Sequence, residues 1–286
     1  MTERGGYFGS KLRFRLFTTV KYTVYALLCV NVYLFAQEEL LALEYTFGSG
    51  VAAAEIIQVF SATIDTAAWV LLLLLFELET SALDDRKIHG PVKWALHGIR
   101  GLCSLAIVYA FTGYYAELVT LYNVVPVSAN DACTLVTQNL SLLVDLDEYV
   151  PLNLDNCAAV GTELYRVSGF AIVVDAQTLE DARWLARTDV LNAAAWILVV
   201  IVLEVEVRLQ LRGNLSTQVM NSTKFIKFLL YAILFVAAAY WGYAGDFLDF
   251  WDAALWLFAF IFIELNVFEW QYETSQPDTA VADQPL

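Results

Sequence analysis

The sequence has few charged side chains and almost none of the residues that metal enzymes use. Only 16% of its 286 residues are charged and 59% are hydrophobic, whereas about a quarter of a typical soluble domain is charged. There are two histidines, His89 and His97, and their separation does not match the i, i+4 spacing of a helical metal site. No Walker loop, nucleophile elbow or metal-type cysteine cluster is present. The composition excludes an ordinary soluble domain, and we expect no enzyme activity, cofactor or metal.

Long apolar runs are what the sequence has in abundance. Six of them are long enough for transmembrane helices, at about residues 14–36, 58–79, 97–117, 188–207, 225–245 and 251–268. We therefore expect an all-α polytopic membrane protein with six transmembrane helices. Its expected surroundings are the lipid bilayer, and a homo-oligomer is a possible assembly. The expected parts are membrane segments 1–117 and 189–270, an extracytoplasmic α+β domain over 118–188 and a disordered tail over 271–286.

The distribution of basic residues predicts the orientation of these helices. Of the 16 basic residues, 13 lie at the N-terminus or between the second and third and the fourth and fifth apolar runs. By the positive-inside rule, these segments and both termini are cytoplasmic, and we expect a plasma membrane, such as a bacterial inner membrane. The net charge of −15 would repel nucleic-acid phosphates, so no nucleic-acid partner is expected.

Cysteine is also rare, and its four copies are of two kinds. Cys29 and Cys103 lie inside apolar runs, where a lone cysteine packs as a small apolar side chain. Cys133 and Cys157 lie in the long outer segment, in the compartment where disulfides persist, and we predict that they pair.

The same outer segment contains signals for a strand and a helix. Residues 164–174 are rich in β-branched and aromatic side chains and predict a strand or hairpin. Thr178, followed three residues later by Asp181, has the form of a helix capping box. This segment is either a disulfide-linked lid without a function of its own or a module that binds a ligand or a protein partner.

One pattern occurs three times within the apolar runs. Each copy has an acidic or amide residue, a Trp four residues on and a Glu twelve residues on: Asp65, Trp69 and Glu77; Asn192, Trp196 and Glu204; Asp252, Trp256 and Glu264. Two residues further on stand Glu79, Glu206 and Asn266. The odd-numbered runs repeat more weakly, with Lys21, Arg100 and Lys227 in register. The identical spacing predicts three repeated two-helix hairpins.

Three two-helix repeats are also the architecture of mitochondrial carriers. No Pro-x-Asp/Glu-x-x-Lys/Arg motif ends the odd-numbered runs here, so the comparison supplies no activity.

The spacing of the repeated pattern puts acidic groups inside the bilayer. Twelve residues rise about 18 Å in a helix, whereas the hydrocarbon core is about 30 Å thick. A carboxylate within a membrane is costly and by default indicates a functional site. The helical phase places Asp65, Trp69 and Glu79 on one face and directs Glu77 toward a neighbouring helix. Each hairpin can then pair one basic residue with one Glu near its cytoplasmic end, with Lys21, Arg100 and Lys227 as the basic partners.

Three interpretations of the repeated residues remain open. In the first, they line the path of a cation- or proton-translocating channel or carrier, as rings of Asp65, Asn192 and Asp252 and of Glu77, Glu204 and Glu264, with Glu79 and Glu206 beside them. In the second, the chain is a non-transport assembly subunit or sensor whose extracytoplasmic domain binds a protein partner. In the third, the repeated residues are only packing contacts and ion pairs.

Overall fold

The structure, a computed structural model, describes residues 11–46, 56–79, 90–128, 131–211 and 217–275. Within these ranges the chain is mostly helical, with seven α-helices: α1 (Lys11–Thr46), α2 (Ile56–Val59), α3 (Ser61–Glu77), α4 (Pro91–Tyr122), α5 (Ala176–Leu211), α6 (Thr217–Ala244) and α7 (Phe247–Ser275). Four stretches of the described residues are long and apolar enough to cross a membrane: Arg15–Leu43, Pro91–Tyr122, Ala176–Glu206 and Gln218–Ala244. Helix length and hydropathy therefore support a polytopic membrane protein.

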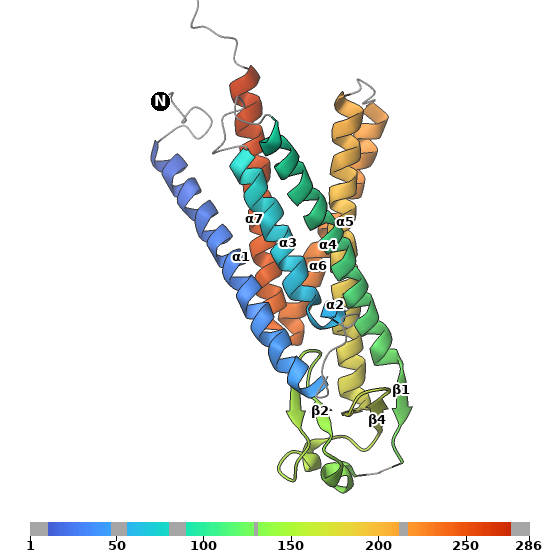
Figure 1. The fold of residues 1–286 in the computed structure, drawn as a ribbon. Helices are drawn as coiled ribbons and strands as arrows, with labels where there is room; N and C mark the ends of the chain where they lie inside the picture. The colour runs from blue at the N-terminus through green and yellow to red at the C-terminus, as the bar shows by residue number, and fades with distance from the viewer. Residues whose placement is uncertain (1–10, 47–55, 80–89, 129–130, 212–216, 276–286) are drawn as a thin grey trace, which may run out of the picture.

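The six long helices form a closed ring. Each packs against the next in the order α1, α3, α4, α5, α6 and α7, and α7 packs back against α1. Successive helices run in opposite directions (Figure 1). The end of the ring that carries the β-sheet is called the domain end below, and the opposite end the far end. Large apolar side chains cover the outside of the ring, such as Leu102, Leu105 and Phe228, as expected for a surface that faces lipid.

A five-stranded sheet with a disulfide lies between α4 and α5. Its strands are β1 (Val124–Pro126), β2 (Ser141–Leu143), β3 (Tyr149–Pro151), β4 (Leu164–Val167) and β5 (Ile172–Asp175), in the order β1-β4-β5-β2-β3. Only the β2–β5 pair is parallel. The predicted hairpin is confirmed as β4 and β5. The predicted disulfide is also confirmed, because Cys133 and Cys157 are bonded, whereas Cys29 and Cys103 are free.

The helix start predicted at Thr178 is wrong. Helix α5 begins at Ala176, and the Asp175 carboxylate accepts hydrogen bonds from the N–H groups of Gln177 and Thr178. Asp175 is the last residue of β5, so the strand itself supplies the cap and the helix starts directly after it.

The sheet is packed onto the helix ends. Leu143, Leu146 and Val174 of this insert form one apolar cluster with Leu121 of α4 and Trp241 of α6. The insert therefore covers the domain end of the ring (Figure 1). At the far end, α7 continues to Ser275, past the expected start of the tail at residue 271, and residues 276–286 lie outside the described ranges.

Candidate functional site

The three copies of the repeated pattern meet inside the ring. Asp65 of α3, Asn192 of α5 and Asp252 of α7 line one cavity of about 30 Å³, together with the three Trp residues of the pattern, Trp69, Trp196 and Trp256. In each copy the Trp follows the polar residue by four positions, which puts both side chains on the same face of the helix. Both side chains of each copy line this cavity, whereas Glu79, expected on the same face as Asp65 and Trp69, does not.

The three indole rings form a cluster, called the Trp trio below. The centroid of the Trp69 ring lies 6.2 Å from that of Trp196 and 6.3 Å from that of Trp256. Trp196 and Trp256 are buried and belong to the main apolar core of the ring. Because α3, α5 and α7 alternate with α4, α6 and α1 around the ring, every second helix contributes one Trp to the centre.

A second cavity, of about 40 Å³, adjoins the first. It shares Asp65, Asn192 and Asp252 with the first cavity and adds Tyr114 of α4, Asp189 of α5 and Asp249 of α7. Asp189 accepts a hydrogen bond of 3.1 Å from the Trp241 indole.

A third cavity, of about 90 Å³, continues from the second to the domain end. It shares Tyr114, Asp189 and Asp249 with the second cavity, and it adds four acidic residues: Glu38, Glu39, Glu117 and Asp147. Asp147 comes from the insert, whose Leu143 and Phe170 also line this cavity. The three cavities together form a path, and the described residues that line it include eight carboxylates and no Lys or Arg. We call it the acidic path.

Two side chains of α1 bind groups beside this path. The fully buried Asn31 donates a hydrogen bond of 2.7 Å from Nδ2 to Oδ1 of Asp252. Glu39 accepts hydrogen bonds from the backbone N–H groups of Ala62 and Thr63 and from the Thr63 hydroxyl. Glu39 thereby caps the start of α3, where the free N–H groups and the helix dipole favour a negative charge.

Two carboxylates outside the long helices, Asp147 in the wall of the path and Asp246 in the turn between α6 and α7, have a raised pKa. Burial, and after it the negative charge of Glu38, raises the pKa of Asp147 well above its ordinary value. Burial also raises the pKa of Asp246, in the turn between α6 and α7, although a hydrogen bond with Asp249 opposes this rise. The cause in both cases is that a carboxylate loses solvation among other acids.

The far half of the ring interior is closed by apolar packing. Beyond the Trp trio the interior is filled by side chains such as Leu28, Val199, Leu234 and Ala259, each at most 1% exposed. The acidic path thus ends at the Trp trio.

Ion pairs hold the helices together at the far end. Lys21 of α1 lies 2.7 Å from Glu77 of α3, and both residues are buried. Glu77 also accepts a hydrogen bond from the Tyr22 hydroxyl. Arg100 lies 2.7 Å from Glu79, and Lys227 lies 2.5 Å from Glu206.

The pairing of Arg100 and Lys227 corrects the prediction of one pair within each hairpin. Arg100 of α4 binds the end of α3, and Lys227 of α6 binds the end of α5. Both pairs thus join a helix to the next one along the chain, α3 to α4 and α5 to α6, which pack side by side in the ring. Glu204 is bound instead by Arg208 on its own exposed helix face, so it does not share the buried setting of Glu77. The side chain of Glu264 lies outside the described residues.

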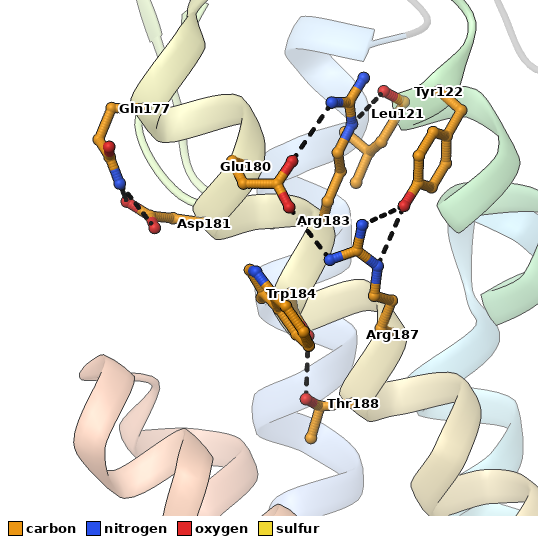
Figure 2. Close-up of polar contacts among 9 residues, drawn as sticks. All are labelled: Leu121, Tyr122, Gln177, Glu180, Asp181, Arg183, Trp184, Arg187 and Thr188. Carbon is orange, nitrogen blue, oxygen red and sulfur yellow. Dashed lines mark hydrogen bonds and ion pairs between the residues drawn. The ribbon is translucent and has the colours of Figure 1, made fainter.

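A separate cluster of basic and aromatic residues joins α4 to α5 near the insert (Figure 2). Arg187 donates to the Tyr122 hydroxyl and to Glu180, and Arg183 donates to Glu180 and to the Leu121 carbonyl. The Arg187 guanidinium also lies 4.5 Å from the Trp184 ring centroid. These contacts engage both arginines within the fold, and they clamp the end of α4 to the first turns of α5.

Sequence reasoning missed several residues of the path. Asp189 and Asp249 each lie three residues before a copy of the repeated pattern, and Tyr114 lies on α4, which carries no copy. Their shared cavity depends on the order of helices in the ring. The signal that could have found the two aspartates was their position at the edge of an apolar run. Among the described residues, no group of three or more His, Cys, Asp or Glu side chains converges in a way that could hold a metal ion.

Comparison of the chain with protein-family models, with curated proteins and with solved structures finds no match.

Proposed function

We propose that this protein crosses the membrane six times and translocates a cation or a proton along the acidic path. The observation that carries the proposal is the row of three adjoining cavities, whose walls hold eight carboxylates and no Lys or Arg. Walls of this charge attract cations and repel anions. Acidic side chains inside a membrane bundle are costly, and where they occur they mark ion or proton pathways.

The ring supports six membrane passes. Helix α3 packs between α1 and α4, and α7 packs between α6 and α1; α1, α4 and α6 each contain a stretch long enough to span. The 17 residues of α3 rise about 25 Å, slightly less than a hydrocarbon core of about 30 Å. The excess of basic residues at the far end favours a cytoplasmic location for that end and for both termini.

The closed far half favours a carrier or a gated channel over an open pore. The acidic path is lined by polar groups only from the domain end to the Trp trio, and the interior beyond it is packed with apolar side chains. An ion that enters from the domain end can leave at the far end only after the helices rearrange. Alternation between two such states is how carriers move a substrate past a fixed site.

The test is a flux measurement in liposomes that contain the purified protein. Uptake of radiolabelled sodium and rubidium, and proton flux with a trapped pH dye, are measured under imposed gradients. We expect Asp65→Asn combined with Asp252→Asn to lower the flux by about tenfold or more, because the path loses the charges that offset ion dehydration. Glu77→Gln combined with Glu264→Gln tests whether the acidic residues of the repeated pattern at the far end also affect the flux.

The matched control is Asp155→Asn, which makes the same chemical change at an exposed position of the insert. It should leave the flux unchanged. Absence of flux under every gradient, or flux that is the same in all these variants, would refute a transport function.

The closed far half also favours a second function, that of a sensor or assembly subunit. A sensor needs access to its ion site from one side only, and the exposed surface of the insert, which includes Leu154 at 76% exposure, could bind a protein partner. If the protein shows no flux and a stoichiometric partner co-purifies with the wild type but not with Leu154→Asp, this function replaces transport.

A further inference from the structure

We propose that the cavity at the inner end of the acidic path, between Asp65, Asn192 and Asp252, is a binding site for one monovalent alkali cation. The inference rests on the proposed function, because this site would hold the translocated ion at the point where the path stops.

A buried amide oxygen in the wall of this cavity, and a second one next to its wall, have no hydrogen-bond donor among the described residues. Asn31 is 0% exposed, and while its Nδ2 donates to Asp252, its Oδ1 has no partner among the described residues. Asn31 therefore contacts Asp252, although it does not itself line either inner cavity. Oδ1 of Asn192, which lines both inner cavities, is also buried and has no partner in the described part of the chain. Native proteins rarely leave such acceptors unsatisfied.

A cation in the cavity satisfies the Asn192 oxygen and the two carboxylates of Asp65 and Asp252 together. The Asp252 carboxylate is oriented by Asn31, and Asp65 faces it across the cavity from α3, with Trp69 and Tyr114 as neighbouring polar groups. Neither inner cavity has a Lys or Arg in its wall. Positive charge at this depth must therefore come from a bound ion or proton, because two unpaired carboxylates away from water would repel each other.

The ligands favour an alkali cation over other metals. The cavity offers only oxygen: the carboxylates of Asp65 and Asp252, the amide of Asn192 and the hydroxyl of Thr66. Oxygen ligands suit hard cations and not the softer transition metals. Calcium is held by six to eight oxygens, several of them from carboxylates, whereas no group of three acidic, His or Cys side chains converges in the described residues. Two carboxylates with neutral oxygens therefore match one positive charge better than two.

The aromatic wall and the size of the cavity point to the same class of ion. The ring faces of Trp69, Trp196 and Trp256 can attract a cation that has shed part of its water. A cavity of about 30 Å³, joined to one of about 40 Å³, holds an ion with roughly one or two water molecules. It is too small for an organic cation of drug size.

The Trp trio provides a direct probe of binding. Thallium(I) is a monovalent cation of about the size of potassium, and it quenches Trp fluorescence on close approach. The purified protein in detergent is titrated with thallium(I) nitrate, then with sodium, potassium or calcium as competitors. We expect a saturable quenching phase that sodium or potassium reverses and that calcium at the same concentration does not.

Three variants and one control locate this phase. Asp65→Asn and Asp252→Asn should each weaken thallium binding by about 30-fold or more, because each removes a buried charge from the site. Asn192→Asp supplies a third carboxylate and should make calcium an effective competitor. Asp155→Asn should bind as the wild type does. A single elution peak at the wild-type volume establishes that each variant is folded.

The outcomes separate this site from the proposed function. Saturable binding that depends on Asp65 and Asp252, without ion flux in liposomes, keeps the site and refutes transport. Flux of protons that depends on these residues, without saturable thallium binding, keeps transport and overturns the alkali-cation site. Saturable binding that is the same in all variants also overturns it, since the ion would then bind elsewhere.

Discussion

The ion pair of Lys21 and Glu77 allows a quantitative test of how burial controls the strength of a charge pair in this ring. The change is Lys21→Met, which keeps most of the side-chain volume and removes the charge. The N–O distance is 2.7 Å, and the two side chains are 6% and 10% exposed. Arg100 and Glu79 are an internal control, because they are also 2.7 Å apart but their side chains are 45% and 23% exposed.

The expected losses differ because the charge left behind differs in solvation. Removal of Lys21 leaves a buried carboxylate that still accepts a hydrogen bond of 2.9 Å from the Tyr22 hydroxyl, and the loss of one partner of a buried ion pair costs about 3–5 kcal/mol. Arg100→Met leaves Glu79 partly in contact with solvent, and an exposed pair contributes about 0–1 kcal/mol. The unfolding equilibrium should therefore shift by about 100-fold or more in the first variant and by about fivefold or less in the second.

The assay is reversible unfolding in mixed micelles of increasing sodium dodecyl sulfate content, followed by circular dichroism. The double variant Lys21→Met/Glu77→Gln should regain most of the lost stability, because it removes the unpaired charge. Equal losses in Lys21→Met and Arg100→Met, or no recovery in the double variant, would show that burial does not set the strength of this pair.

Three further predictions concern the insert and the start of α3. Replacing both Cys133 and Cys157 by Ser should destabilise the insert by about 3–4 kcal/mol, because the disulfide spans 24 positions and limits the unfolded chain; thermal unfolding with and without reductant measures this, and reductant should not affect the variant. Asp147→Asn should stabilise the protein at pH 8 and leave it unchanged near pH 4. The raised pKa of Asp147 in the native state means that the native state binds more protons than the unfolded state. Stability therefore falls as the pH rises from about 4, the ordinary Asp pKa, through the native pKa. Melting temperatures of the wild type and the variant across this range measure the effect, and the same pH dependence in both proteins would contradict it. Glu39→Gln should speed amide hydrogen exchange at the start of α3, where Glu39 accepts from the Ala62 N–H at 2.8 Å, and equal exchange rates there would exclude a capping role.

The long helices, the β4–β5 hairpin and the disulfide could be predicted from short stretches of the sequence. Apolar runs predicted the long helices, β-branched residues predicted the β4–β5 hairpin, and two outer cysteines predicted the disulfide, because each signal needs only chain periodicity or compartment. The ion pairs of Arg100 and Lys227 were harder to predict, because their partners depend on which helices are neighbours in the ring. Asn31 gave no signal, since a single Asn in an apolar run does not indicate which helix it faces.

The start of α5 shows a different reason for failure. Thr178 satisfied a local rule for capping, yet the strand before the helix placed Asp175 at the cap position first. The insert thus determines where α5 begins. Tertiary context also decided the acidic path, because Glu38 of α1, Glu117 of α4 and Asp147 of the insert line one cavity although 79 and 30 residues separate them along the chain.

The distribution of charge along the ring interior argues for a gate at the Trp trio. At the domain end, acidic side chains have no basic neighbour in the walls of the acidic path; at the far end, Glu77 is paired with a buried Lys. Unpaired carboxylates in a water-accessible cavity attract cations, whereas a paired carboxylate is already neutralised. If the protein translocates cations as proposed, a cation that reaches Asp65 and Asp252 gains little by moving on unless Lys21 leaves Glu77. In this arrangement, passage of the cation from Asp65 and Asp252 to the far end is opposed both by the apolar packing beyond the Trp trio and by the Lys21–Glu77 pair. Weakening the Lys21–Glu77 pair should then raise ion flux and lower stability. If the pair only holds α1 to α3, weakening it should lower both flux and stability.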